Sequence, residues 1–212
     1  MFQIKKILLG TITFSLIYVI CLVFWIQLKP YYGMIMTRTG AECAALFSYF
    51  RLDDFEHDNE NGRMIYSRVI YTPKGLADLN IELNIKVSNY SFNIPLTITL
   101  VAVLFYMLKW NSRTMTEIIA LILLTHLCYI FFYISLHLFY YSHPEKIPSL
   151  TTIFKQYFLE FMWAFIDNMV IRFEPFLIAL YLVFKKSQIQ LKQNLSMNWT
   201  GSKRKRGLRL IR

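Results

Sequence analysis

Cysteine is scarce in this sequence, and its pattern excludes two common uses of the residue. The 212 residues hold three cysteines, an odd number, and no two of them have the Cys-x-x-Cys spacing. Cys21 and Cys128 fall inside hydrophobic runs, whereas Cys43 lies in a more polar segment. We therefore expect neither a disulfide framework nor a zinc site.

The short motifs of common enzyme classes are also missing. The chain has no His-Glu-x-x-His, Gly-x-Ser-x-Gly, Walker or Gly-x-Gly-x-x-Gly sequence, and no internal repeat of the kind that many transporters carry. His126 and Cys128 lie two residues apart, so on a helix they point in different directions. No catalytic residue, cofactor or metal is assigned from the sequence.

Long hydrophobic runs dominate what is present. Hydrophobic residues make up 56% of the chain, against a usual share of about 45–50%. The first run, Ile7 to Leu28, is uncharged and, at about 1.5 Å per residue, can cross a hydrocarbon core of about 30 Å. Lys5 and Lys6 precede it, and the bulky residues at its end do not suit cleavage, so we expect an uncleaved anchor helix. The sequence predicts a mainly α, integral membrane fold with four transmembrane helices, at residues 1–28, 94–110, 118–139 and 158–184.

Residues 29–93 are polar enough to lie outside the membrane. Thr39 to Phe50 begins with Thr-x-x-Glu, which predicts a short capped helix. Asn61-Gly62 indicates a two-residue hairpin turn. Apolar and polar residues alternate over residues 81–87, as in a strand with one buried face. The buried face of the middle strand, Met64 to Tyr71, is not assigned. We expect a small three-stranded β-meander between the first two membrane helices, supported by the helices beneath it.

Positive charge is distributed unevenly along the chain, and this predicts the orientation. The segments expected on the inner side hold thirteen Lys or Arg residues and one acid, Glu117. The outer segments hold nine Lys or Arg residues and nine acids. Because positively charged loops stay inside, both termini should be cytoplasmic and the meander extracytoplasmic. The basic cytoplasmic tail, residues 185–212, is expected to contact anionic lipid and not nucleic acid.

The fourth predicted helix carries polar residues at depths where lipid is expected. They are Glu160, Asp167, Asn168, Arg172 and Glu174. A charge at the centre of a spanning helix costs about 2.5–3.5 kcal/mol, so water or other helices must cover these residues. The three acids recur every seven residues and therefore lie on nearly one helical face. Pro175 follows the cluster and is expected to kink the helix.

A polar stripe on the third predicted helix is a candidate to meet these acids. It consists of His126, Tyr129, Tyr133 and His137, which share one helical face. If the third and fourth helices pack antiparallel, residues at the same depth in the membrane can meet. We then expect His137 to meet Glu160, the two tyrosines to meet Asp167, and His126 to meet Glu174 or Arg172. Two interpretations stay open. The polar residues either hold the helices together or line a groove for a substrate or a partner helix.

The layout of the chain adds a resemblance. An N-terminal anchor is followed by a polar outer segment that ends in an amphipathic strand, then by Asn89 to Leu96 (NYSFNIPL) and by a charged last helix that contains proline. This order resembles the exosortase H-associated membrane proteins, which are small bacterial membrane proteins. The resemblance implies an inner-membrane protein that works beside an exosortase, the transpeptidase that recognises C-terminal sorting tails. It carries over no catalytic residue. An exosortase itself has more spans and a cysteine, arginine and histidine set that Cys43 does not reproduce.

Two functions follow from these observations. The first is a non-catalytic accessory protein of an exosortase-type sorting system, which docks the sorting enzyme, another membrane protein or the substrate tail. The alternative is a small membrane enzyme or transport subunit that uses the intramembrane polar residues.

Overall fold

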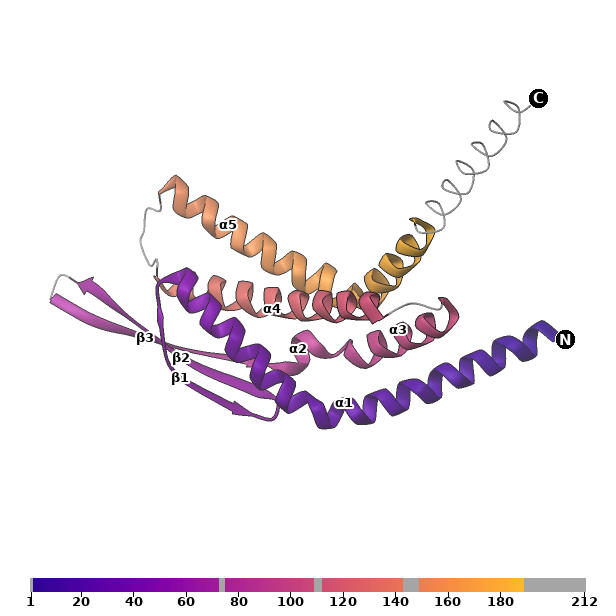
Figure 1. Cartoon of the computed structure of the whole chain (residues 1–212). Helices are drawn as coiled ribbons and strands as arrows, with labels where there is room; N and C mark the ends of the chain where they lie inside the picture. The colour runs from indigo at the N-terminus through magenta and orange to yellow at the C-terminus, as the bar shows by residue number, and fades with distance from the viewer. Residues whose placement is uncertain (1, 73–74, 109–111, 143–148, 189–212) are drawn as a thin grey trace, which may run out of the picture.

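The chain begins with one long helix. The computed structural model describes residues 2–72, 75–108, 112–142 and 149–188, and its first element, α1, is a single helix over Phe2–Ser48 (Figure 1). At about 1.5 Å per residue, α1 is about 70 Å long, more than twice what a membrane core requires. The predicted end at residue 28 and the separate helix from Thr39 to Phe50 are therefore wrong. The hydroxyl of Thr39, expected to cap a helix, donates instead to the carbonyl of Ile35 at 2.8 Å.

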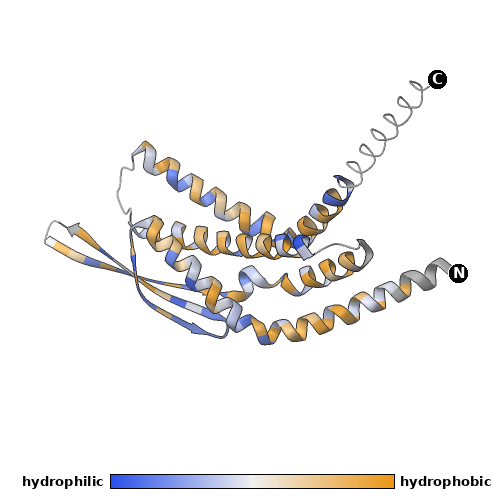
Figure 2. Ribbon diagram, in the orientation of Figure 1, coloured by the Kyte–Doolittle hydropathy of each residue, from blue (hydrophilic) through white to orange (hydrophobic). Residues whose placement is uncertain are grey.

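Most of the remaining chain is helical, as predicted. The helices are α2 Val87–Ser91, α3 Ile94–Leu108, α4 Ser112–Ser142, α5 Leu150–Phe165, the π-helix η1 Ile166–Ile171, and a further helix over residues 172–188. Figure 2 shows hydrophobic residues along α1, α3 and α4, and hydrophilic residues on β1.

Three stretches of the described residues are long and apolar enough to cross a membrane. They are Gly10–Ser48, Val87–Phe105 and Ser112–Ser142, and they correspond to the first three predicted spans. Residues 109 and 110 of the second span, and residues 189–212 of the basic tail, lie outside the described residues. The fourth predicted span, 158–184, is helical but interrupted by η1, and its crossing stays a prediction.

Close packing accounts for the length of α1. Pro30 lies inside the helix, and α1 bends along its length (Figure 1), as an interior proline predicts. Beyond it, a Cβ atom on Gly33 would lie 2.4 Å from Cγ2 of Val87, and one on Gly40 would lie 2.5 Å from Cγ2 of Ile130. Small residues thus let the backbone of α1 approach α2 and α4. This contact outweighs the capping signal in the middle of α1.

A three-stranded antiparallel sheet follows α1. Its strands are β1 Arg51–Asp58, β2 Asn61–Thr72 and β3 Gly75–Lys86, in the spatial order β1-β2-β3. The predicted meander is therefore confirmed. Its side of the membrane stays a prediction.

The first hairpin turn lies two residues before its predicted place. Asp58 pairs with Asn61, so the turn consists of Asn59 and Glu60, and Asn59 takes the left-handed φ of 37°. Gly62 belongs to β2, where a Cβ atom would lie 2.7 Å from Cγ2 of Thr37 on α1. The glycine of the Asn-Gly pair therefore serves close packing and not the turn.

The sheet buries one face against α1. The apolar residues at positions 81, 83 and 85 of β3 are buried and the polar residues between them are exposed, which confirms the predicted alternation. On β2, the buried face holds Met64 and Tyr66, which join Ala41 and Ala44 of α1 in one cluster. The sheet therefore rests on the second half of α1.

Glu60 ties the first hairpin to the helices. Its carboxylate pairs with Lys29 of α1 and accepts the N–H of Ser88 at 3.0 Å, and its carbonyl accepts the N–H of Val87 at 2.8 Å. Burial acts to raise the pKa of Glu60, but the hydrogen bonds from Lys29 and Ser88 outweigh it and hold the pKa below its usual range. The charge at this turn thus holds the start of α2 in place.

Candidate functional site

His126 lies at the centre of a buried polar network. Its Nε2 lies 2.8 Å from Oε2 of Glu174, and its Nδ1 lies 2.5 Å from the hydroxyl of Tyr32. The side chains of His126 and Glu174 are 0% and 3% exposed. A neutral imidazole satisfies both contacts, because Nε2–H donates to the carboxylate while Nδ1 accepts the tyrosine proton. The predicted pairing of His126 with Glu174 is confirmed, and the alternative with Arg172 is wrong.

The second oxygen of Glu174 extends this network to α3. Oγ1 of Thr97 lies 3.2 Å from Oε1 of Glu174 and 3.0 Å from the carbonyl of Asn93. The network therefore joins α1, α3, α4 and the helix over residues 172–188. A buried carboxylate is costly unless it is hydrogen-bonded in this way, so these contacts hold the four helices together.

Asn93 repairs the backbone at the bend of the last helix. Pro175 has no N–H, so the carbonyl of Ile171, four residues earlier, loses its usual partner. Nδ2 of Asn93 donates to that carbonyl at 2.6 Å and approaches the carbonyl of Arg172 at 3.3 Å. Figure 1 shows that the chain changes direction between α5 and the helix after η1. The kink predicted from Pro175 thus coincides with a π-helix just before it.

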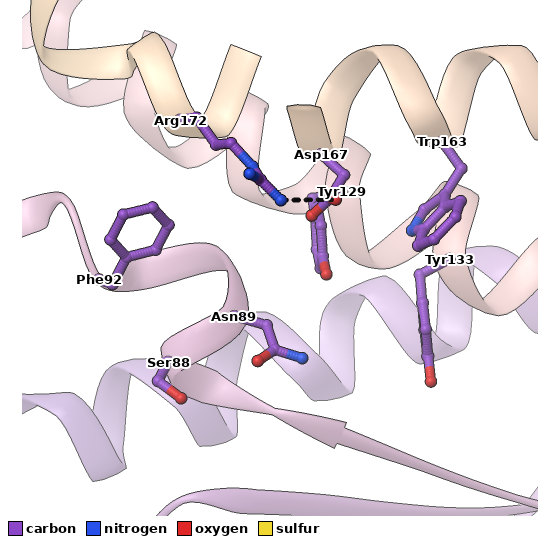
Figure 3. A pocket seen from close by; sticks show the side chains of 8 residues that line it. All are labelled: Ser88, Asn89, Phe92, Tyr129, Tyr133, Trp163, Asp167 and Arg172. Carbon is purple, nitrogen blue, oxygen red and sulfur yellow. Dashed lines mark ion pairs between the residues drawn. The ribbon is translucent and has the colours of Figure 1, made fainter. Parts of the chain in front are cut away.

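A polar groove lies beside the bend. Its volume is about 720 Å³, within the range of roughly 300–1,000 Å³ typical of binding pockets. Three parts of the chain line the groove: α2 with its C-terminal cap, α4, and the stretch from α5 to the residue after η1. The lining residues are Ser88, Asn89, Phe92, Tyr129, Tyr133, Trp163, Asp167 and Arg172 (Figure 3). Four of these residues come from the predicted cluster and the predicted facing stripe.

The charges of the groove are only loosely paired. Nη2 of Arg172 lies 3.9 Å from Oδ2 of Asp167, and the two side chains are 61% and 24% exposed. Figure 3 shows the Asp167 carboxylate between Arg172 and Tyr129, so the expected depth match of Asp167 with this tyrosine is confirmed. A pair that long and that exposed contributes little to stability, about 0–1 kcal/mol. Both charges can therefore face a bound group.

Tyr133 connects the groove to the sheet. Its ring stacks on Tyr129 with 6.4 Å between centroids, and its hydroxyl donates to the carbonyl of Asn84 on β3 at 3.2 Å. Tyr133 was also predicted to meet Asp167, and the structure places both residues in the lining of the groove.

The other predicted site residues lie outside the groove. Glu160 is bonded to Tyr140 at 2.5 Å and to Gln156 at 2.9 Å. Nδ1 of His137 lies 2.8 Å from the carbonyl of Tyr133, one turn back on its own helix. The predicted pairing of His137 with Glu160 is therefore wrong, because the Glu160 carboxylate is bonded to Tyr140 and Gln156 instead. Asn168 likewise donates to a carbonyl of its own helix, that of Ala164, at 2.9 Å.

Several residues of the network and groove were not predicted from the sequence. Tyr32 was assigned neither to the polar residues of the fourth predicted helix nor to the polar stripe of the third, yet its hydroxyl contacts His126. Asn89, Phe92 and Asn93 belong to the segment from Asn89 to Leu96, which was noted for its resemblance and not for contacts. Nothing in the sequence indicated that Trp163 belongs to a site, because aromatic residues are common in apolar runs. The described residues contain no group of three His, Cys, Asp or Glu side chains that could hold a metal ion.

Comparison with known proteins gives one family match. A family model described as "Exosortase H-associated membrane protein" matches residues 3–186. Neither the curated proteins nor the solved structures give a match.

Proposed function

Because the chain belongs to the exosortase H-associated membrane proteins, we propose that it is a non-catalytic accessory protein of an exosortase-type sorting system. The observation that carries this proposal is the groove, which combines partly exposed charges with aromatic side chains. In this proposal the groove docks a segment of the exosortase, and the sheet, which contacts Tyr133 of the groove through Asn84, positions that segment.

The proposed membrane arrangement has four spans, with both termini in the cytoplasm of a bacterial cell and the protein in the inner membrane. At about 1.5 Å per residue, α4 is about 46 Å long, close to the roughly 40–45 Å of a bilayer with its head groups. Residues 87–108, which form α2 and α3, cover only about 33 Å. Ser88 and Asn89 at the groove would then lie near the outer edge of the hydrocarbon core. A segment entering from the outer leaflet would reach the groove directly.

Site-specific crosslinking tests this proposal. A photoreactive amino acid at Phe92, which is 52% exposed and lines the groove, should crosslink to the co-expressed exosortase. The matched control is Leu76, which is 66% exposed on β3 and does not line the groove. Crosslinks of equal yield from both positions, or from neither, would contradict docking in the groove.

The alternative function rests on the Tyr32–His126–Glu174 chain. A buried tyrosine, histidine and carboxylate in sequence form the kind of arrangement that can relay protons in membrane proteins. If the protein is a small enzyme or transport subunit, Tyr32→Phe, which removes the hydroxyl and keeps the ring, and Asp167→Asn should abolish its activity. Normal sorting of exported proteins by variants that fold normally would instead support the accessory role.

A further inference from the structure

A second cavity lies near the C-terminal end of α4, where α1, β2 and α5 meet. Its volume is about 180 Å³, below the roughly 300–1,000 Å³ of pockets that hold drug-sized molecules. It therefore fits one small chemical group. Its polar lining consists of Ser48, Arg68, Ser135, Ser142 and Lys155, and it shares no residue with the groove.

Two cations line this cavity from different elements. Arg68 has the same parity on β2 as the buried Met64 and Tyr66, so its side chain lies on the face that packs on the helices. Lys155 lies one turn before Leu159, which is buried against α4. In the part of the chain that the structure describes, no carboxylate oxygen lies within 4 Å of either cation.

Aromatic rings hold both cations at the cavity. Nζ of Lys155 lies 5.0 Å from the ring centroid of Phe47, and Cζ of Arg68 lies 5.5 Å from that of Phe50. A ring face attracts the charge but uses few of the N–H donors of the cation. The remaining donors are available to an acceptor in the cavity.

Ser135 supplies a further donor. Its side chain is 1% exposed, and its hydroxyl has no hydrogen-bond partner among the described residues. Buried hydroxyl groups are nearly always bonded, because leaving one unpaired after removal from water is costly. An anion in the cavity would accept this hydroxyl and remove that cost.

We propose that Arg68, Lys155 and Ser135 form a binding site for a phosphate oxyanion. Exposed hydrophobic side chains on the elements that line the cavity favour the head group of a phospholipid as the source. Leu46 and Tyr49, at the end of α1, are 80% and 83% exposed, and Leu150 and Phe154, on α5, are 83% and 72% exposed. In the membrane arrangement proposed above, the last turns of α4 reach the head-group level. Lipid chains would cover the apolar side chains while the phosphate enters the cavity.

Binding to the purified full-length protein tests the site. The protein is stripped of lipid in detergent, and its unfolding temperature is followed as short-chain phosphatidylglycerol or inorganic phosphate is added. The double variant Arg68→Gln with Lys155→Gln removes both charges and keeps much of the side-chain volume. Hydrogen bonds to charged groups are strong enough that each lost cation should weaken binding about tenfold. The matched control, Arg51→Gln, removes an 85% exposed cation at the same end of the sheet and should leave binding unchanged.

The outcomes separate the two sources of phosphate. A shift with phosphatidylglycerol alone identifies a lipid head group, and an equal shift with inorganic phosphate identifies a free anion; both support the site. Ser135→Ala keeps both charges and removes no protein hydrogen bond, so it should fold normally and bind more weakly. The proposal is overturned if neither probe shifts the unfolding temperature, if the double variant binds as tightly as Arg51→Gln, or if Ser135→Ala binds as tightly as the unchanged protein.

Discussion

His126 is bonded at both ring nitrogens, and this determines how the charged helix is held. One nitrogen contacts Glu174 and the other contacts Tyr32, with no exposed surface on the imidazole. The buried carboxylate of Glu174 is thus held by a hydrogen bond from a histidine. Arg172, by contrast, is largely exposed at the groove.

Removing one partner of this buried hydrogen bond should be destabilising. Glu174→Ala leaves the Nε2–H of the buried His126 without an acceptor, and an unsatisfied buried donor typically costs about 1–3 kcal/mol. The double variant Glu174→Leu with His126→Leu removes both polar groups and should recover most of that loss. Thermal unfolding in detergent measures the stability of the single and the double variant. The control, Arg172→Ala, should cost about 0–1 kcal/mol, and an equal loss in Arg172→Ala would contradict this assignment.

The contact between Asn93 and the kink predicts a coupled pair of substitutions. Asn93→Ala leaves the carbonyl of Ile171 unpaired and should cost about 1–3 kcal/mol. Pro175→Ala restores the missing N–H, so Asn93→Ala should cost less in that background. The four unfolding free energies form a double-mutant cycle. Additive effects would show that Asn93 does not compensate for the proline.

At the scale of elements, the packing of α1 on α4 depends on a glycine. A Cβ atom on Gly40 would lie 2.5 Å from Cγ2 and 2.9 Å from Cβ of Ile130, which is too close to the α4 backbone to move away. Gly40→Ala should therefore destabilise the protein, because overpacking costs about 1–3 kcal/mol and exceeds the gain in helix propensity of about 1 kcal/mol. The matched control is Gly10→Ala, where no atom lies within 4 Å. An unchanged free energy of unfolding in Gly40→Ala would mean that α1 and α4 pack less closely than the structure shows.

The hairpin turn at Glu60 predicts a dependence on pH. The pKa of Glu60 is held below its usual value, so its contribution is present above the unfolded-state pKa of about 4.3 and is lost as the pH falls through the lower folded-state pKa. The carboxylate is partly exposed, so the effect should stay below about 1 kcal/mol. The free energy of opening at Ser88, measured by hydrogen exchange, should fall in acid. In Glu60→Gln it should not change over the same range, and a parallel fall there would assign the effect to another group.

The whole molecule combines a helical bundle with a small antiparallel sheet, and its proposed orientation in the membrane is testable. The excess of Lys and Arg on one side predicts that both termini face the cytoplasm. A reporter that works only in the cytoplasm should be active when fused after Ser112 or at the C-terminus. It should be inactive when fused after Gly75, at the start of β3. Activity at Gly75 would overturn the proposed arrangement of four spans.

Local pattern was sufficient for the features that repeat along the chain. Apolar runs predicted the helices, and alternation predicted β3. Helical spacing predicted that His126 meets Glu174 or Arg172, and the structure shows Glu174. Contacts between residues far apart in the sequence accounted for the rest. The continuation of α1 past Thr39, the place of the first turn, and the roles of Tyr32 and Asn93 all depend on what lies opposite in space. A capping or turn signal is worth about 1 kcal/mol, and the packing of α1 on α4 and on the sheet exceeds it. Helix ends, turns and the groove are therefore properties of the packed molecule.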